Sequence, residues 1–239
     1  MQKKSFALKC LPFFFFCVLA PALVVLGYRY LDSRYYYVSA LGLIVLSLSL
    51  FFFTFEKRKL KTTEVVCIAV MAALCAASRV AFGFIPQVKP MCALVIITAI
   101  SFGGSVGFVV GALSVFVSNF TFGQGMFTPF QMLGMGLTGF FCALFFFDRP
   151  KMTNRVSVGA IGGVLTFAVY GFIVDTCSVF MMAGDYSFKS VLAVYLSGVP
   201  FNLVHAAATA VVLFLFFKPM NDKLSRLHTK YGIFSEENI

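Results

Sequence analysis

The chain contains no tryptophan and is poor in charged residues. Only 12% of its 239 residues are charged, whereas a soluble domain carries about 25%. Hydrophobic residues make up 60% of the chain, and the mean hydropathy is +0.94. This composition excludes an ordinary soluble domain. It predicts an integral membrane protein that crosses the bilayer several times.

Motifs of common catalytic and metal sites are also missing. The sequence has no G-x-x-x-x-G-K-[ST], no H-E-x-x-H and no G-x-S-x-G. The seven cysteines form no C-x-x-C pair, and the two histidines, His205 and His228, cannot complete a zinc site with them. We therefore predict that the protein is not an enzyme and has no catalytic residues, no metal site and no cofactor. If its function uses ATP, we expect another chain to hydrolyse it.

Eight apolar runs are separated by short polar or basic segments, and we expect each run to form a helix. The runs cover residues 11–28, 38–55, 65–84, 91–102, 105–118, 129–147, 156–182 and 190–217. The run at 91–102 is shorter than the roughly 20 residues of a full crossing, so we expect it to tilt or to stop short at a cavity. The first run is expected to be a retained helix, not a removed signal peptide.

These runs predict an all-α fold, a polytopic membrane helical bundle. We expect a six-helix core at residues 62–217, preceded by a transmembrane hairpin and basic linker at 1–61 and followed by a polar cytoplasmic tail at 218–239.

Lysine and arginine are distributed unequally between the two sides of this predicted bundle. With the N-terminus inside, 14 of the 19 basic residues lie on the cytoplasmic side and 5 on the other. An excess of basic residues marks cytoplasmic loops. We therefore predict a multi-pass plasma membrane protein with both termini in the cytoplasm, and no nucleic-acid partner despite the net charge of +10. The links at 85–90, 119–128 and 184–189 then face outside.

The segment Asn119–Met132 combines aromatic rings with amides, a mixture that is rare both in exposed loops and in membrane cores. Its glycines and Pro129 predict a break between two helices. Such a segment suits the lining of a cavity in which a small organic ligand stacks and hydrogen-bonds. An aromatic belt at the membrane interface, with amides that cap helices, explains the same composition equally well.

Two ionisable residues, Arg79 and Asp175, lie inside predicted helices near the outer side. A charge in apolar surroundings is costly unless it is paired or faces water. The two residues either pair with each other or help to form a binding cavity, and the sequence leaves both possibilities open.

Small residues recur every four positions in two of the predicted helices. Such stripes let helices approach closely in lipid. For the glycines we expect packing within the chain, and for the alanines a partner helix is a serious alternative. The two stripes are Gly103, Gly107 and Gly111, and Ala69, Ala73 and Ala77.

Several segments of the core together resemble a known family. They are Ala-Ala-Leu-Cys-Ala-Ala-Ser-Arg at 72–79, Ile-Pro-Gln-Val-Lys-Pro at 85–90, Gly-Phe-Val-Val-Gly-Ala-Leu at 107–113, Val-Ser-Asn-Phe at 117–120 and Gly-Gln-Gly-Met-Phe-Thr-Pro-Phe-Gln-Met at 123–132. The chain resembles the substrate-binding S components of energy-coupling factor (ECF) vitamin transporters, and most closely the cobalamin-type S components, over roughly residues 62–217.

The resemblance implies a six-helix protein that binds a vitamin, here cobalamin or a related corrinoid, from outside and topples to deliver it inward. The links at 84–90 and 120–128 would cover the pocket. The expected partners are the lipid bilayer, a transmembrane T subunit and two ATPase subunits. The T subunit would dock on Ala69 and Ala73, with Ala77 on the same face. The substrate-binding residues that we predict are Arg79, Phe84, Gln87, Lys89, Asn119, Phe120, Gln124, Phe127, Thr128, Gln131, Asp175 and Asn202.

Other functions remain open from the sequence. The ligand could be another vitamin, such as riboflavin. A membrane enzyme acting on a lipid or quinone would need a set of acid–base groups, for which Asp175 and His205 are the candidates. A scaffold subunit without a ligand would have a closely packed outer end.

Overall fold

The computed structural model describes residues 61–147, 149, 152–182 and 187–234, and the predicted hairpin at 11–55 lies outside them. All the regular elements of this part of the chain are helices. They are α3 (Thr62–Ala81), α4 (Met91–Phe102), α5 (Gly104–Phe122), α6 (Phe127–Phe146), α7 (Arg155–Leu165), the π-helix η2 (Thr166–Gly171), α8 (Phe172–Met182) and α9 (Phe188–Tyr231).

The helices form six apolar segments. Helices α7, η2 and α8 follow one another without a break and make up one of them, Arg155–Met182. Five segments are long and apolar enough to cross a membrane, and α4 is a shorter sixth. The predicted all-helical, polytopic membrane bundle is therefore confirmed.

Helix α4 forms the centre of the bundle. All twelve of its residues are buried, and it packs against α3, α5, α6 and α9. A helix that is apolar on every side suits this position, because no face of it meets lipid headgroups or water. Its shortness therefore reflects a central place among longer helices.

Helix α5 approaches α4 and α6 closely because it carries glycines on the contact face. A Cβ atom at Gly111 would lie 3.0 Å from the backbone of Gly136 in α6, and one at Gly107 would overlap Ala99 in α4. In lipid, such close backbone approach is a main source of helix association. The glycine stripe thus packs within the chain, as expected.

The end of α5 differs from the prediction. We expected an irregular segment from Asn119 onward, but α5 continues to Phe122 and ends at Gly123, whose φ of 97° favours glycine. Since α6 starts at Phe127, the irregular link is residues 123–126 only. The physical reason is that the Asn119 side chain bonds to neighbouring helices and so does not compete for its own backbone.

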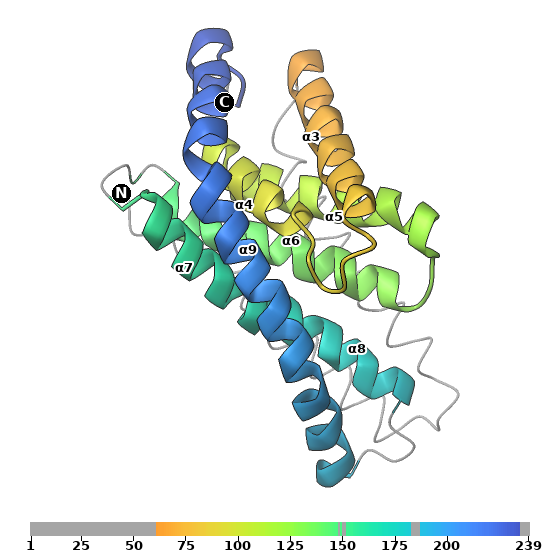
Figure 1. Cartoon of the computed structure of the whole chain (residues 1–239). Coiled ribbons are helices and arrows are strands. Elements are labelled where there is room, and N and C mark those ends of the chain that lie inside the picture. Colours follow the sequence, from red (N-terminus) through yellow and green to blue (C-terminus); the bar gives the residue numbers. More distant parts are fainter. Residues whose placement is uncertain (1–60, 148, 150–151, 183–186, 235–239) are drawn as a thin grey trace, which may run out of the picture. The chain divides into compact units, whose positions relative to one another are not determined.

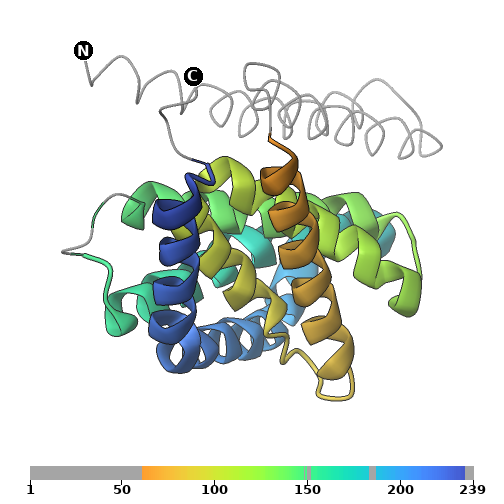
Figure 2. The ribbon, with the colours of Figure 1, turned by 90° about the horizontal axis from the view of Figure 1, so that it is seen from above.

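Helix α9 continues past the predicted end of the last span. Its 44 residues correspond to about 66 Å, well over the roughly 30 Å of a bilayer core. Pro200 and Pro219 lie inside it, and Figure 2 shows it bent between its main part and its dark blue C-terminal part. The polar residues 218–231 are therefore a helical extension.

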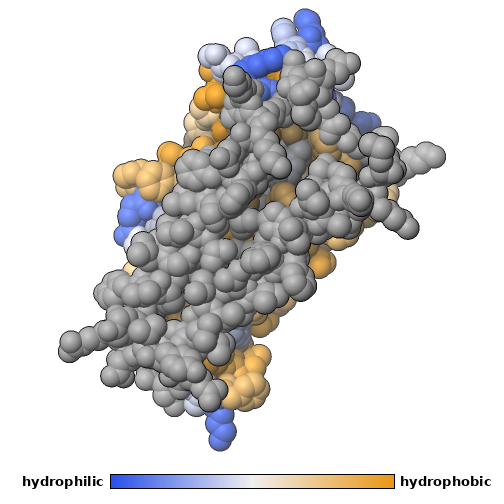
Figure 3. Space-filling model, turned by 180° about the vertical axis from the view of Figure 1, so that it is seen from behind, coloured by the Kyte–Doolittle hydropathy of each residue, from blue (hydrophilic) through white to orange (hydrophobic). Residues whose placement is uncertain are grey.

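The beginning and end of the described core meet at one end of the bundle. The backbone N–H of Phe234 donates to Oε1 of the buried Glu64, at 2.7 Å. The end of α8 and the start of α9 lie at the opposite end, as Figure 1 shows. On the face seen in Figure 3, hydrophobic side chains predominate among the coloured residues, and the hydrophilic ones form small separate groups.

Candidate ligand-binding site

A cavity of about 360 Å³ lies between the α3–α4 link, α6, η2, α8 and α9. Its lining mixes apolar groups with amides, hydroxyls and two charged side chains, as is usual for sites that bind small organic molecules. The residues that line it are Gln87, Lys89, Gln131, Tyr170, Val174, Asp175, Ser178, Met182, Val194, Ser197, Gly198, Phe201, Asn202 and His205.

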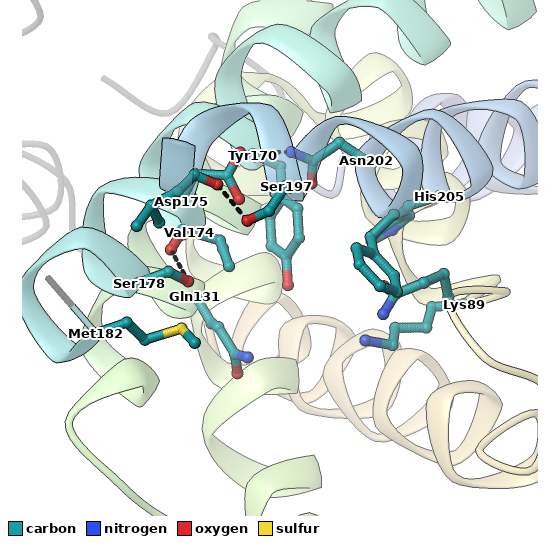
Figure 4. A pocket seen from close by; sticks show the side chains of 14 residues that line it. Lys89, Gln131, Tyr170, Val174, Asp175, Ser178, Met182, Ser197, Asn202 and His205 are labelled. Carbon is teal, nitrogen blue, oxygen red and sulfur yellow. Dashed lines mark hydrogen bonds between the residues drawn. The ribbon is translucent and has the colours of Figure 1, made fainter. Parts of the chain in front are cut away.

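One end of the cavity is formed by a polar contact between α8 and α9 (Figure 4). The Asn202 amide donates to Oδ2 of Asp175, at 2.6 Å. Two glycines make room for this pair. A Cβ at Gly198 would overlap the Asp175 carboxylate, and a Cβ at Gly171 would lie 2.8 Å from Cγ of Asn202. The spacing of the two helices thus fixes where the carboxylate sits.

The other end of the cavity is basic. Lys89 and His205 lie at this same end, and the ammonium group of Lys89 points toward the middle of the cavity (Figure 4). The ring of His205 packs edge-on against Tyr170, with 5.0 Å between centroids. His205 is 2% exposed, and its Nε2 has no hydrogen-bond partner.

Arg79 stands behind this basic end. It is 6% exposed and donates through Nη1 to Ser118 and Asn119, at 2.6 and 2.7 Å, while its Nε has no partner. Burial, reinforced by the positive charge of Arg79, lowers the pKa of Lys89 from 10.5 to about 8. Lys89 is therefore mostly charged at neutral pH and sits in an environment that opposes its charge.

The amides of the α5–α6 region bond mainly to one another. Asn119, which is 0% exposed, donates from Nδ2 to Thr128 and Gln131, at 3.0 and 3.1 Å. The Thr128 hydroxyl donates to Oε1 of Gln124, at 3.0 Å. With Arg79, these groups form a network that ties α3, α5 and α6 together. Of this network only Gln131 also lines the cavity.

The predicted aromatic cover lies elsewhere. Phe84 is 80% and Phe120 is 70% exposed, and Phe120 packs edge-on against Phe116 of its own helix. Phe127 is partly buried beside Gly125. None of the three lines the cavity. The link at 120–128, which we expected to cover the pocket, thus contributes no residue to the lining of this cavity, because Gln124 and Thr128 bond to neighbouring groups and Phe120 is exposed.

Five of the twelve predicted residues line the cavity, namely Gln87, Lys89, Gln131, Asp175 and Asn202. The other seven do not, namely Arg79, Phe84, Asn119, Phe120, Gln124, Phe127 and Thr128.

The acid–base pairs considered from the sequence are not formed. Arg79 bonds to α5, whereas Asp175 bonds to Asn202, so the two do not pair. Asp175 and His205 lie at opposite ends of the cavity in Figure 4. Among the described residues, these candidates therefore do not form an acid–base set, and the cavity itself argues against a closely packed scaffold.

Sequence reasoning missed most of the wall that α9 contributes. Its lining residues are Val194, Ser197, Gly198, Phe201, Asn202 and His205. These positions follow the i, i+3, i+4, i+7, i+8, i+11 spacing of one helix face. Starting from Asn202, this periodicity alone would have found the others.

The chain was compared with known families and proteins. Residues 59–222 match the family model described as ECF-type riboflavin transporter, S component. Searches of curated proteins and of solved structures gave no significant match. Because the family match covers well over half of the chain, the chain belongs to the family of ECF-type riboflavin transporter S components, the substrate-specific membrane subunits of these transporters.

Proposed function

We propose that the protein captures a vitamin from outside the cell and delivers it inward together with a T subunit and two ATPase subunits. Its family supports the general role, since an S component works within an ECF module. The observation that carries the proposal is the cavity of about 360 Å³ with its mixed apolar and polar lining. The excess of basic residues on the α3 N-terminal side supports an orientation in which the cavity end faces outside.

The dimensions of the cavity favour a vitamin of the size of riboflavin. Its lining on α9 runs from Val194 to His205, a length of about 16 Å along the helix. Its volume of about 360 Å³ lies near the lower limit of about 300–1,000 Å³ for small-molecule sites. A corrinoid has about three times as many non-hydrogen atoms as riboflavin and needs a larger site. We therefore favour riboflavin, or another flat vitamin of similar size, over the corrinoid expected from the sequence.

The lining offers suitable groups for such a ligand. Tyr170 and Phe201 supply rings for stacking, and Val174 adds apolar surface. Gln87 and Gln131 supply amides that both donate and accept hydrogen bonds. In this proposal the ligand is contacted by Gln87, Lys89, Gln131, Asp175 and Asn202. The buried network around Asn119 keeps the neighbouring helices in place.

The exposed face of α3 suits a helix of the T subunit. Ala69, Ala73 and Ala77 are all exposed, with Val70 and Leu74 beside them. Small residues let a partner helix approach closely in lipid. The opposite face of α3 is buried within the bundle, so partner binding on the alanine face would leave the fold intact.

Titration of the purified protein with single vitamins tests the proposal. We expect riboflavin, or another vitamin from a panel that includes cobalamin, to bind with one-to-one stoichiometry in calorimetry without ATP. Tight binding of cobalamin alone would refute the size argument, and no binding across the panel would refute the vitamin-capture function.

A further inference from the structure

The positive charge at the basic end of the cavity has no counter-charge among the described residues. Neither Lys89 nor Arg79 forms an ion pair there. Arg79 donates hydrogen bonds to the neutral side chains of Ser118 and Asn119, and its guanidinium lies over the Phe122 ring, 4.9 Å from the centroid. Arg79 is buried and Lys89 is partly buried, and a charge withdrawn from water is costly unless something compensates it. Asp175, the acidic residue of the cavity wall, lies at the far end and already accepts a hydrogen bond from Asn202.

Unpartnered polar atoms are found at the same end. Nε2 of His205 and Nε of Arg79 are both buried without a hydrogen-bond partner. Native proteins leave few buried polar atoms without a partner, and those that remain call for an explanation. His205 lines the cavity at the same end as the Lys89 ammonium, so a bound group with acceptor atoms could satisfy both residues.

We propose that Lys89 and His205 form an anion subsite, so that a vitamin carrying a carboxylate or phosphate, such as a phosphorylated flavin, places that group at this end of the cavity and binds more tightly than its neutral form. The inference rests on the proposed function and refines it by naming the chemical class of ligand. The far end, at Asp175, then receives groups that donate hydrogen bonds. Arg79 supports the subsite from behind through its charge.

The charged and titratable groups around Lys89 come from several elements. Arg79 of α3 and His205 of α9 are near it, and Tyr170 of η2 and Asp175 of α8 line the same cavity. Burial and Arg79 lower the pKa of Lys89 to about 8. An anion bound beside Lys89 opposes both effects and favours the charged amine. The uncompensated positive charge in the free cavity therefore favours the binding of an anion.

Matched ligand pairs test the subsite on the full chain in detergent micelles at pH 7. Riboflavin is compared with riboflavin 5′-phosphate, and nicotinamide with nicotinate, so that phosphate and carboxylate are tested separately. We expect the anionic member of at least one pair to bind about 10- to 100-fold more tightly than the neutral member, the range of a charge-assisted hydrogen bond.

Variants assign that preference to the subsite. Lys89→Met should abolish it, and Lys89→Arg, which keeps the charge, should retain most of it. Lys189→Met is the matched control, because Lys189 is exposed near the start of α9 and does not line the cavity. Circular dichroism and size-exclusion chromatography verify that each variant is folded.

The outcomes separate the two proposals. If a vitamin binds but its neutral form binds as tightly as its anionic form, or Lys89→Met weakens both forms equally, the subsite is refuted and the vitamin-binding function stands. If neither these pairs nor the vitamin panel bind, the vitamin-binding function fails and the subsite fails with it.

Discussion

Replacing Asn119 with alanine tests whether the amides near the α5–α6 link hold helices together or bind the ligand. Oδ1 of Asn119 accepts a hydrogen bond from the buried Arg79, and Nδ2 donates two more to Thr128 and Gln131. Loss of a bond to a charged group costs about 1.5–3 kcal/mol, and loss of a neutral one about 1 kcal/mol. Bonds inside membrane proteins average somewhat less, about 0.6 kcal/mol.

We therefore expect Asn119→Ala to lower the free energy of unfolding by about 3 kcal/mol, which is about 100-fold in the ratio of folded to unfolded protein. The measurement is an unfolding titration with SDS in mixed micelles, followed by circular dichroism. Thr121→Ala is the control: Thr121 is exposed on the same helix, so its loss should change stability by no more than about 0.5 kcal/mol.

The same variant should keep its affinity for the vitamin within about threefold under native conditions, because Asn119 does not line the cavity. The reasoning would be refuted by a variant as stable as the wild type that no longer binds the vitamin. That result would show Asn119 to be a ligand contact, as the sequence had suggested.

Three further predictions concern the cavity and the partner face. The affinity for an anionic ligand should be highest below pH 8 and fall by up to tenfold per pH unit above it, because the free Lys89 amine loses its proton near its pKa of about 8. Calorimetry from pH 7 to 9.5 measures this affinity, and an affinity that does not change with pH would contradict the prediction. Gly198→Val should weaken vitamin binding at least tenfold, because its side chain would displace the Asp175 carboxylate; unchanged affinity would exclude this end of the cavity as a contact. Ala73→Leu should spare binding by the purified chain but abolish uptake in cells, whereas Ala207→Leu, at an exposed position of α9, should affect neither; normal uptake by the Ala73 variant would remove this face from the partner interface.

The comparison of sequence and structure shows where pattern reasoning works and where it stops. Apolar runs located the six core segments, because a helix that crosses the bilayer core must carry apolar side chains along most of its length. Helix ends were less certain. Asn119 was assigned to an irregular segment because of the glycines and the proline that follow it, whereas its side chain bonds to Arg79 of α3 and Thr128 of α6, which its neighbours in the sequence do not reveal.

The same limit applies to the candidate site. Lys89, Asp175 and Asn202 stood out because polar groups are rare in apolar surroundings, and all three line the cavity. Asn119 and Thr128 stood out for the same reason but point into contacts between helices. Rarity indicates that a polar side chain needs a partner, and it does not say whether that partner is a neighbouring helix or a ligand.

By itself the sequence determined that this is a membrane protein, where its six core segments lie and to which family it belongs. These properties depend on local composition and on motifs of adjacent residues. Only the tertiary structure decided which polar groups meet in the cavity and which are satisfied by neighbouring helices. The physical reason is that the cavity joins residues from Gln87 to His205. Their positions are set where η2 and α8 cross α9, at Gly171 and Gly198, through contacts between residues far apart in the chain.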